Sequence, residues 1–257
     1  MTLPHAAFLF VVALAAGALN SVAGGGSFLS FPALIFTGMP PVNANATNTA
    51  ALWPGTAASV AAYRQVISGH KREFLPLVLT GITGGLLGAV VLLRTPQATF
   101  LKMVPWLLLS ATLLLTFSRQ FTNALGPLIP GEGDRPSRKA ILAGAGVQLC
   151  IAIYIGFFGA GAGILMMAMF AIMGVRSIHT INGLKTMLAT VCNGVAIVAF
   201  IYARAIVWPQ ALLMLCGAAV GGYGGAWYAQ KLPARFIRWF AIATGFAMTA
   251  WFFIKTW

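Results

Sequence analysis

Apolar segments, several of them about as long as a membrane span, recur along the whole chain and constrain its fold more than any other feature. A helix needs about 20 apolar residues to cross a bilayer, and lipid tolerates only helices and closed barrels as spanning structures. Only 7% of the 257 residues are charged, whereas a soluble domain carries roughly a quarter. The sequence therefore predicts an all-α polytopic membrane protein and argues against a soluble enzyme, a disordered chain and a secreted disulfide scaffold.

The apolar segments differ in length. Residues 27–37 and 163–173 form two runs of about eleven residues that reach only half way across a bilayer. Each follows a glycine cluster, so we expect each to be the return arm of a broken helical hairpin. The first long segment lacks the preceding basic residues of a signal peptide and is expected to stay in the mature fold. The other clear segments are residues 5–22, 53–63 with their upstream flank, 74–93, 100–117, 140–158, 186–202, 208–228 and 236–254.

The basic residues indicate how the chain crosses the membrane. The 16 Lys and Arg residues outnumber 3 acids and give a net charge of +13. If each broken hairpin returns to its starting side, eleven basic residues fall on one side and four on the other, with Lys185 left inside the membrane. Cytoplasmic loops are enriched in Lys and Arg, so we expect both termini outside an inner (plasma) membrane. This sorting also speaks against nucleic-acid binding, which needs a basic solvated face.

The two halves of the sequence match each other at an offset of 137 residues without a gap. We therefore predict a first membrane repeat at 1–118, a cytoplasmic linker at 119–139 and a second repeat at 140–257. Each repeat would contain a glycine-broken hairpin and about three spanning helices. The matched pairs are Gly24 with Gly161, Gly26 with Gly163, Asn45 with Asn182, Thr49 with Thr186, and Gly84, Gly85 and Gly88 with Gly221, Gly222 and Gly225.

An odd number of crossings in each repeat would invert the second half relative to the first. Inverted repeats with broken helices are typical of secondary transporters, whose substrates bind near the middle of the membrane. A duplication kept only for packing is the alternative.

The glycine clusters are the first candidate substrate site. They contain Gly24, Gly25 and Gly26 before Ser27, and Gly161 and Gly163 in the second half. Consecutive glycines break a helix, and the freed N–H groups at the start of the next half-helix suit an anion. Close helix crossing is the alternative role for these glycines.

A repeated polar face is the second candidate. Asn45 and Asn48 lie three residues apart, as do Asn182 and Lys185, so each pair shares one helical face. Lys185 is a charge placed at the start of an apolar helix, where an ionisable group is by default a functional hypothesis. Helix capping is the alternative for the asparagines, and snorkelling to the interface is the alternative for the lysine.

The acids and histidines limit the chemistry of the site. Glu73, Glu132 and Asp134 are the only acids, and all lie in loops, so no intramembrane carboxylate is expected to carry a proton or Na⁺. The three histidines are scattered, so we expect neither a metal site nor a cofactor. No residue constellation suggests an enzyme. The expected cavity is neutral to positive and suits an anion.

The motifs also resemble a known family. Residues 20–26 and 45–49, with weaker copies at 159–163 and 182–186, are similar to the TauE/SafE permeases, which are described as sulfite exporters. The resemblance covers nearly the whole chain and implies an inner-membrane carrier of sulfur-containing anions: sulfite, sulfonates such as sulfoacetate, or related organic acids. In the second half the triple glycine is loosened to Gly159, Gly161 and Gly163.

The resulting hypothesis is a secondary transporter of small sulfur-containing anions that works by alternating access between the repeats. A passive anion or small-solute channel on the same scaffold is the alternative, and a membrane assembly protein without transport has no support in the sequence. The expected partners are the anionic substrate and the lipid bilayer. A coupling ion (H⁺ or Na⁺), a homodimer, and import or export are all compatible with the sequence.

Overall fold

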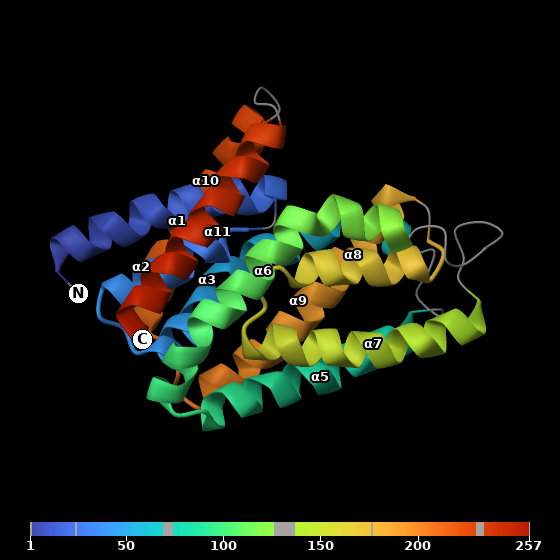
Figure 1. Cartoon of the computed structure of the whole chain (residues 1–257), viewed down its shortest axis with the longest axis horizontal. Coiled ribbons are helices and arrows are strands. Elements are labelled where there is room, and N and C mark those ends of the chain that lie inside the picture. The colour runs from blue at the N-terminus through green and yellow to red at the C-terminus, as the bar shows by residue number, and fades with distance from the viewer. Residues whose placement is uncertain are drawn as a thin grey trace. The chain divides into compact units, whose positions relative to one another are not determined.

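A computed structural model describes residues 2–23, 25–68, 74–125, 137–175, 177–229 and 234–256. All regular secondary structure in these ranges is helical, which confirms the predicted all-α fold (Figure 1). The helices are α1 (Leu3–Ala23), α2 (Ser27–Phe36), α3 (Pro41–Ala62), α4 (Arg64–Ser68), α5 (Leu75–Arg94), α6 (Gln97–Leu125), α7 (Arg138–Phe157), α8 (Ala162–Ile172), α9 (Ile178–Tyr202), α10 (Trp208–Ala229) and α11 (Ala234–Thr256).

Helix length separates spanning helices from shorter ones. In the described ranges, five helices contain stretches long and apolar enough to cross a membrane. By contrast, α2 and α8 have 10 and 11 residues, which at 1.5 Å per residue reach about half of the hydrocarbon core. The five stretches are Leu3–Asn20, Leu75–Arg94, Gln97–Ser118, Arg138–Phe157 and His179–Tyr202.

The two short helices run back along the helices that precede them. At the start of α2, Gly26 lies against Ala16 in the second half of α1, while Phe36 at the end of α2 lines one groove with Phe8 near the start of α1. In the other hairpin, Met173 follows α8 and contacts Gly144 near the start of α7. Both pairs are therefore the broken hairpins that the glycine clusters predict.

Both short helices also end in the same cap. Gly38 and Gly174 take left-handed backbone angles, with φ of 86° and 89°, as in the Schellman motif. They lie 136 residues apart, so the repeat slips by one residue at this cap. The cap bonds run from the N–H groups of Gly38 and Met39 to Ile35 O and Leu34 O, and from those of Gly174 and Val175 to Ala171 O and Phe170 O.

The chain divides into two compact units, which are described separately. Unit 1 comprises Met1–Gly55, Leu92–Leu113 and Phe200–Trp257, and unit 2 comprises Thr56–Val91 and Leu114–Ala199. Each unit contains segments from both predicted sequence repeats, 1–118 and 140–257. Of the predicted linker 119–139, residues 126–136 lie outside the described ranges.

In unit 1, glycines bring α1 and α10 into close contact. A Cβ atom on Gly17 would lie 2.2 Å from the carbonyl oxygen of Ala218, and one on Gly221 would lie 1.9 Å from that of Leu14. Real Cβ atoms do not approach backbone so closely, so these positions require glycine. Small residues serve the same purpose in other membrane helix pairs.

Unit 2 repeats this arrangement with α5 and α7. A Cβ atom on Gly88 would lie 2.0 Å from the carbonyl oxygen of Ile153, and one on Gly156 would lie 2.1 Å from that of Gly85. The repeat relates α5 to α10 and α7 to α1. In the described residues, the repeated glycines at 84–88 and 221–222 therefore serve helix packing.

Candidate functional site

In unit 1 the start of α2 meets the polar face of α3. The amide nitrogen of Asn48 donates to Ser27 Oγ at 3.2 Å, and the Ser30 hydroxyl bonds to the amide oxygen of Asn48. Ser30 and Asn48 are almost fully buried, at 0% and 3% exposed. The structure thus brings together two of the residues predicted to bind substrate, Ser27 and Asn48, and adds Ser30, which the sequence did not single out.

The remaining predicted residues of unit 1 have more ordinary surroundings. Gly25 and Gly26 are buried, and a Cβ atom on Gly26 would lie 2.6 Å from the carbonyl oxygen of Ala16, so this glycine lets α2 approach α1. Asn45 is 2% exposed, and its carbonyl accepts a hydrogen bond from Thr49 at 2.9 Å. Gly24 lies outside the described residues.

A polar clamp that sequence reasoning missed joins three chain segments of unit 1. Gln97 Oε1 accepts from the backbone N–H of Val42 at 2.8 Å, and its Nε2 donates to Asn43 Oδ1 at 3.1 Å. Asn43 in turn donates to the carbonyl of Ala205 at 2.9 Å. The signal was available in part, because all three segments were predicted on the same side of the membrane.

In unit 2 the turn between α7 and α8 has a defined shape. Gly159 and Gly161 take left-handed angles, with φ of 78° and 75°, and Gly161 is the N-cap of α8. The Tyr154 hydroxyl donates to the carbonyl of Ala160 at 2.6 Å. Left-handed backbone favours glycine because it lacks a Cβ atom, so these two glycines are explained by the turn itself.

Lys185 on α9 lies along α8. Its Cδ would be 3.5 Å from a Cβ atom on Gly163, and its Nζ lies 3.9 Å from the sulfur of Met167. A thioether is only a weak acceptor. The ammonium therefore sits about one helical turn beyond Gly163 towards the end of α8, rather than at the first amides of that helix.

The described residues offer Lys185 no carboxylate, because all three acids of the chain lie at masked-out positions 73, 132 and 134, outside the described ranges. Asn182, one turn earlier on α9, is half-buried. Unit 2 thus brings Gly163 and Lys185 together within a predicted spanning helix, His179–Tyr202, and leaves the positive charge without a negative partner in the described part of the chain.

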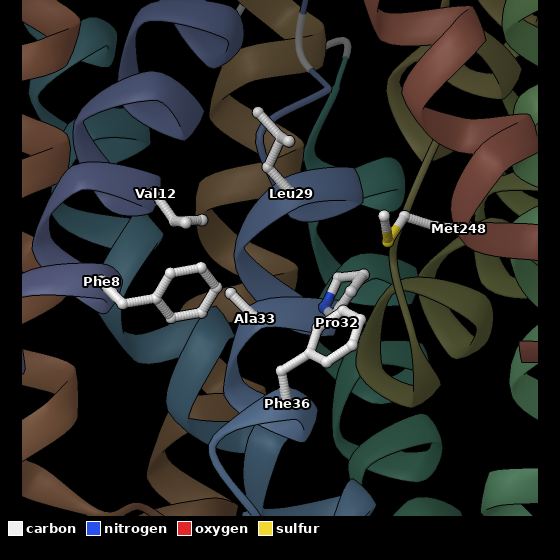
Figure 2. Close-up of a pocket in the computed structure, with 7 residues that line it drawn as sticks. All are labelled: Phe8, Val12, Leu29, Pro32, Ala33, Phe36 and Met248. Carbon is white, nitrogen blue, oxygen red and sulfur yellow. The ribbon is translucent and has the colours of Figure 1, made fainter. Parts of the chain in front are cut away.

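Unit 1 also has a groove of about 440 Å³ between α1, α2 and α11. Figure 2 shows Phe8 and Val12 of α1, Pro32 and Phe36 of α2, and Met248 of α11 around it. Every lining side chain is apolar. An anion needs hydrogen-bond donors to offset its loss of water, so this groove is a poor candidate for the substrate site.

Comparison with known proteins identifies the family. The profile described as "Sulfite exporter TauE/SafE" matches residues 9–252. The chain belongs to this family. It is a multi-pass membrane protein whose similar proteins are described as membrane transporters, as the sequence motifs predicted.

Three similar proteins show how far the likeness extends. A "Probable membrane transporter protein" of Haemophilus influenzae is 28% identical over 95% of this chain and 92% of its own length. The "Probable membrane transporter protein ORF9" of Sinorhizobium sp is 29% identical over 90% and 86%. The "Probable membrane transporter protein YfcA" of Escherichia coli K12 is 27% identical over 94% and 87%. No solved structure matches the chain.

Proposed function

We propose that this protein is a secondary transporter of small sulfur-containing anions: sulfite, sulfoacetate-like organosulfonates or related organic anions. The family supports transport across a membrane. The observation that carries the choice of an anion is Lys185, a cation in a spanning helix whose ammonium has a thioether as its acceptor. A charge inside a membrane is costly unless it is paired, and a bound anion supplies the missing partner.

The proposed substrate contacts follow the sequence motifs. Half-helix N–H groups would hold the anionic oxygens, and polar side chains of α3 and α9 would donate further hydrogen bonds. Transport would proceed by alternating access, in which the bound anion is opened first to one side of the membrane and then to the other. The proposed set is Gly24, Gly25, Gly26, Ser27, Asn45, Asn48, Gly161, Gly163, Asn182 and Lys185.

The location is part of the same proposal. The excess of Lys and Arg in one set of loops supports an inner membrane with both termini outside. Cysteine labelling of an introduced terminal residue in intact cells tests this orientation: an impermeant reagent should reach both termini.

Counterflow in proteoliposomes tests the transport mechanism. Vesicles loaded with unlabelled sulfite should transiently accumulate labelled sulfite from outside, and the initial rate should saturate with concentration. A passive channel would give neither accumulation nor saturation, and this outcome would replace the carrier by the channel. Protein-free vesicles and vesicles with the Lys185→Ala variant serve as controls.

A thermal-shift panel tests the substrate class. A ligand at 100 times its Kd stabilises the folded state by about 2.7 kcal/mol, enough to raise the melting temperature measurably. Sulfite, sulfoacetate and methanesulfonate should stabilise the protein, and chloride should not. Stabilisation by acetate alone would keep anion transport but contradict the preference for sulfur-containing anions.

A further inference from the structure

Each repeat places one pair of side chains at equivalent positions. Ser30 of α2 contacts Asn48 of α3, and Met167 of α8 contacts Lys185 of α9. The residues of each pair are 18 positions apart, and the two pairs are related by the same offset of 137 residues that relates the sequences. The same contact between a short helix and the next long helix therefore occurs once in each unit.

The pair in unit 1 is closed. Both ends of the Asn48 amide are used, the oxygen by Ser30 and the nitrogen by Ser27. The side chains of Ser30 and Asn48 are 0% and 3% exposed. Buried polar groups are normally satisfied in this way, so this cluster explains itself as an interhelical hydrogen bond of a kind common in membrane proteins.

The pair in unit 2 is open. Met167 stands where unit 1 has Ser30, and Ile164 stands where it has Ser27. Both hydroxyl partners of the first pair are thus replaced by side chains that cannot bond an ammonium group well. Lys185 brings three donors, of which the thioether 3.9 Å away can accept only one, weakly.

We infer that the substrate anion binds once per chain, in unit 2, where its charged head displaces the Met167 sulfur from Lys185, while the Ser27–Ser30–Asn48 cluster of unit 1 is a structural lock. The inference rests on the proposed function and narrows its site. A single lysine matches a single negative charge, so a sulfonate or hydrogensulfite head suits this place better than a dianion. Met167 suits a displaceable partner because its unbranched side chain adapts easily.

A double substitution tests the inference directly. Met167→Ser with Lys185→Asn would rebuild the closed pair of unit 1 inside unit 2. The variant should fold, with an unliganded melting temperature equal to or above that of the wild type. Its KM for sulfite in counterflow, and the sulfite and methanesulfonate concentrations that stabilise it, should rise at least about tenfold because a charge-assisted contact is lost.

Three further measurements make the result decisive. Lys185→Gln alone should show the same loss, and this variant decides the matter if the double variant does not fold. Ser30→Ala is the matched change in unit 1; it should lower the melting temperature but keep the KM for sulfite within about twofold. Calorimetric titration of the wild type with sulfite should give one site per chain.

The outcomes separate the inference from the function on which it rests. Wild-type protein that shows no counterflow and no stabilisation by any tested anion contradicts the proposed function. An active wild type combined with an unchanged KM in the double variant and in Lys185→Gln overturns the inference alone. Two anions per chain, or a tenfold loss in Ser30→Ala with no loss of stability, would also overturn it.

Discussion

Unit 1 and unit 2 share a backbone framework but differ at their polar centres. Both have a short helix folded back on a long one, the same glycine cap, and a glycine-lined crossing with a helix from the other repeat. In unit 1 the short helix is tied to the next helix through Asn48, whereas in unit 2 the equivalent residue is Lys185. The glycine framework tolerates few changes, and the polar contacts resting on it have diverged.

This difference has a physical reason. A neutral amide in a dry interior is stable once its donors and acceptor are paired, so the cluster of unit 1 is complete within the chain. A cation inside a membrane is stabilised by an opposite charge, which the described residues do not contain. The comparison therefore predicts that substitutions in the shared framework affect both units alike, whereas substitutions at the polar centres do not.

The largest effects are expected at the helix crossings. Gly221→Val in unit 1 and Gly88→Val in unit 2 would each drive side-chain atoms into backbone oxygens, to which even a Cβ atom would come within 1.9 and 2.0 Å. We expect each to destabilise the protein by about 3 kcal/mol or more, measured as loss of folded, monodisperse protein. A loss in only one of the two variants would show that the crossings are not equivalent.

Two other glycines provide matched controls for these variants. Gly55 in α3 and Gly146 in α7 are exposed, and a Cβ atom on either would meet nothing within 4 Å. Replacement by Ala should be neutral or stabilise by about 0.5–1 kcal/mol, because alanine favours a helix over glycine.

Lys185→Ala should have the next largest effect, and the effect should fall on binding. We expect sulfite affinity to drop about 10- to 100-fold because an ion pair is lost, while unliganded stability stays the same or rises since the buried charge is removed. The sulfite dependence of the melting temperature measures both. Lys102→Ala removes an exposed lysine of α6 and should change neither; an unchanged affinity in Lys185→Ala would exclude that lysine from the site.

Truncating the short-helix partner should affect stability in unit 1 more than in unit 2. Ser30→Ala leaves the buried Asn48 oxygen without its serine donor and should cost about 1–3 kcal/mol. Met167→Leu conserves volume and should cost less than about 1.5 kcal/mol. Denaturant unfolding in detergent ranks the two, and the reverse ranking would contradict the contrast between a closed and an open pair.

The smallest effects concern two glutamines. Gln97 in unit 1 uses both ends of its amide, so Gln97→Met should cost about 1 kcal/mol. Gln148 in unit 2 is fully buried, with its nitrogen 3.7 Å from the sulfur of Cys192 and its oxygen without a partner in the described residues. Gln148→Met should therefore be neutral or slightly stabilising, and a loss above about 1 kcal/mol would show that this oxygen is satisfied.

Much of the fold was predictable from the sequence because the signals are local. Segments of about 20 apolar residues with few charges predict spanning helices, and two shorter runs after glycine clusters predict the hairpins that α2 and α8 form. The motifs at residues 20–26 and 45–49 predicted the family that the comparison confirms. The substrate and the inverted orientation of the repeats stay predictions.

The candidate site was predictable only as a set of residues. Ser27 and Asn48 were expected together, and they are hydrogen-bonded, but their third partner, Ser30, lies in a run that looks simply apolar. Gln97 gave no signal of its own, because its partners come from segments 54 to 55 residues away. A polar side chain acquires a role through partners that the fold brings to it.

By itself, the sequence determined a helical membrane protein with two related halves and almost no acid, because composition and repetition do not depend on distant contacts. The tertiary structure decided which glycines pack helices, which shape a turn, and which of two equivalent polar pairs is closed. The physical reason is that a hydrogen bond or a backbone contact needs both partners in place. The identity of Lys185 can be read from the chain, whereas the lack of a strong acceptor beside its ammonium is seen only once α8 lies against α9.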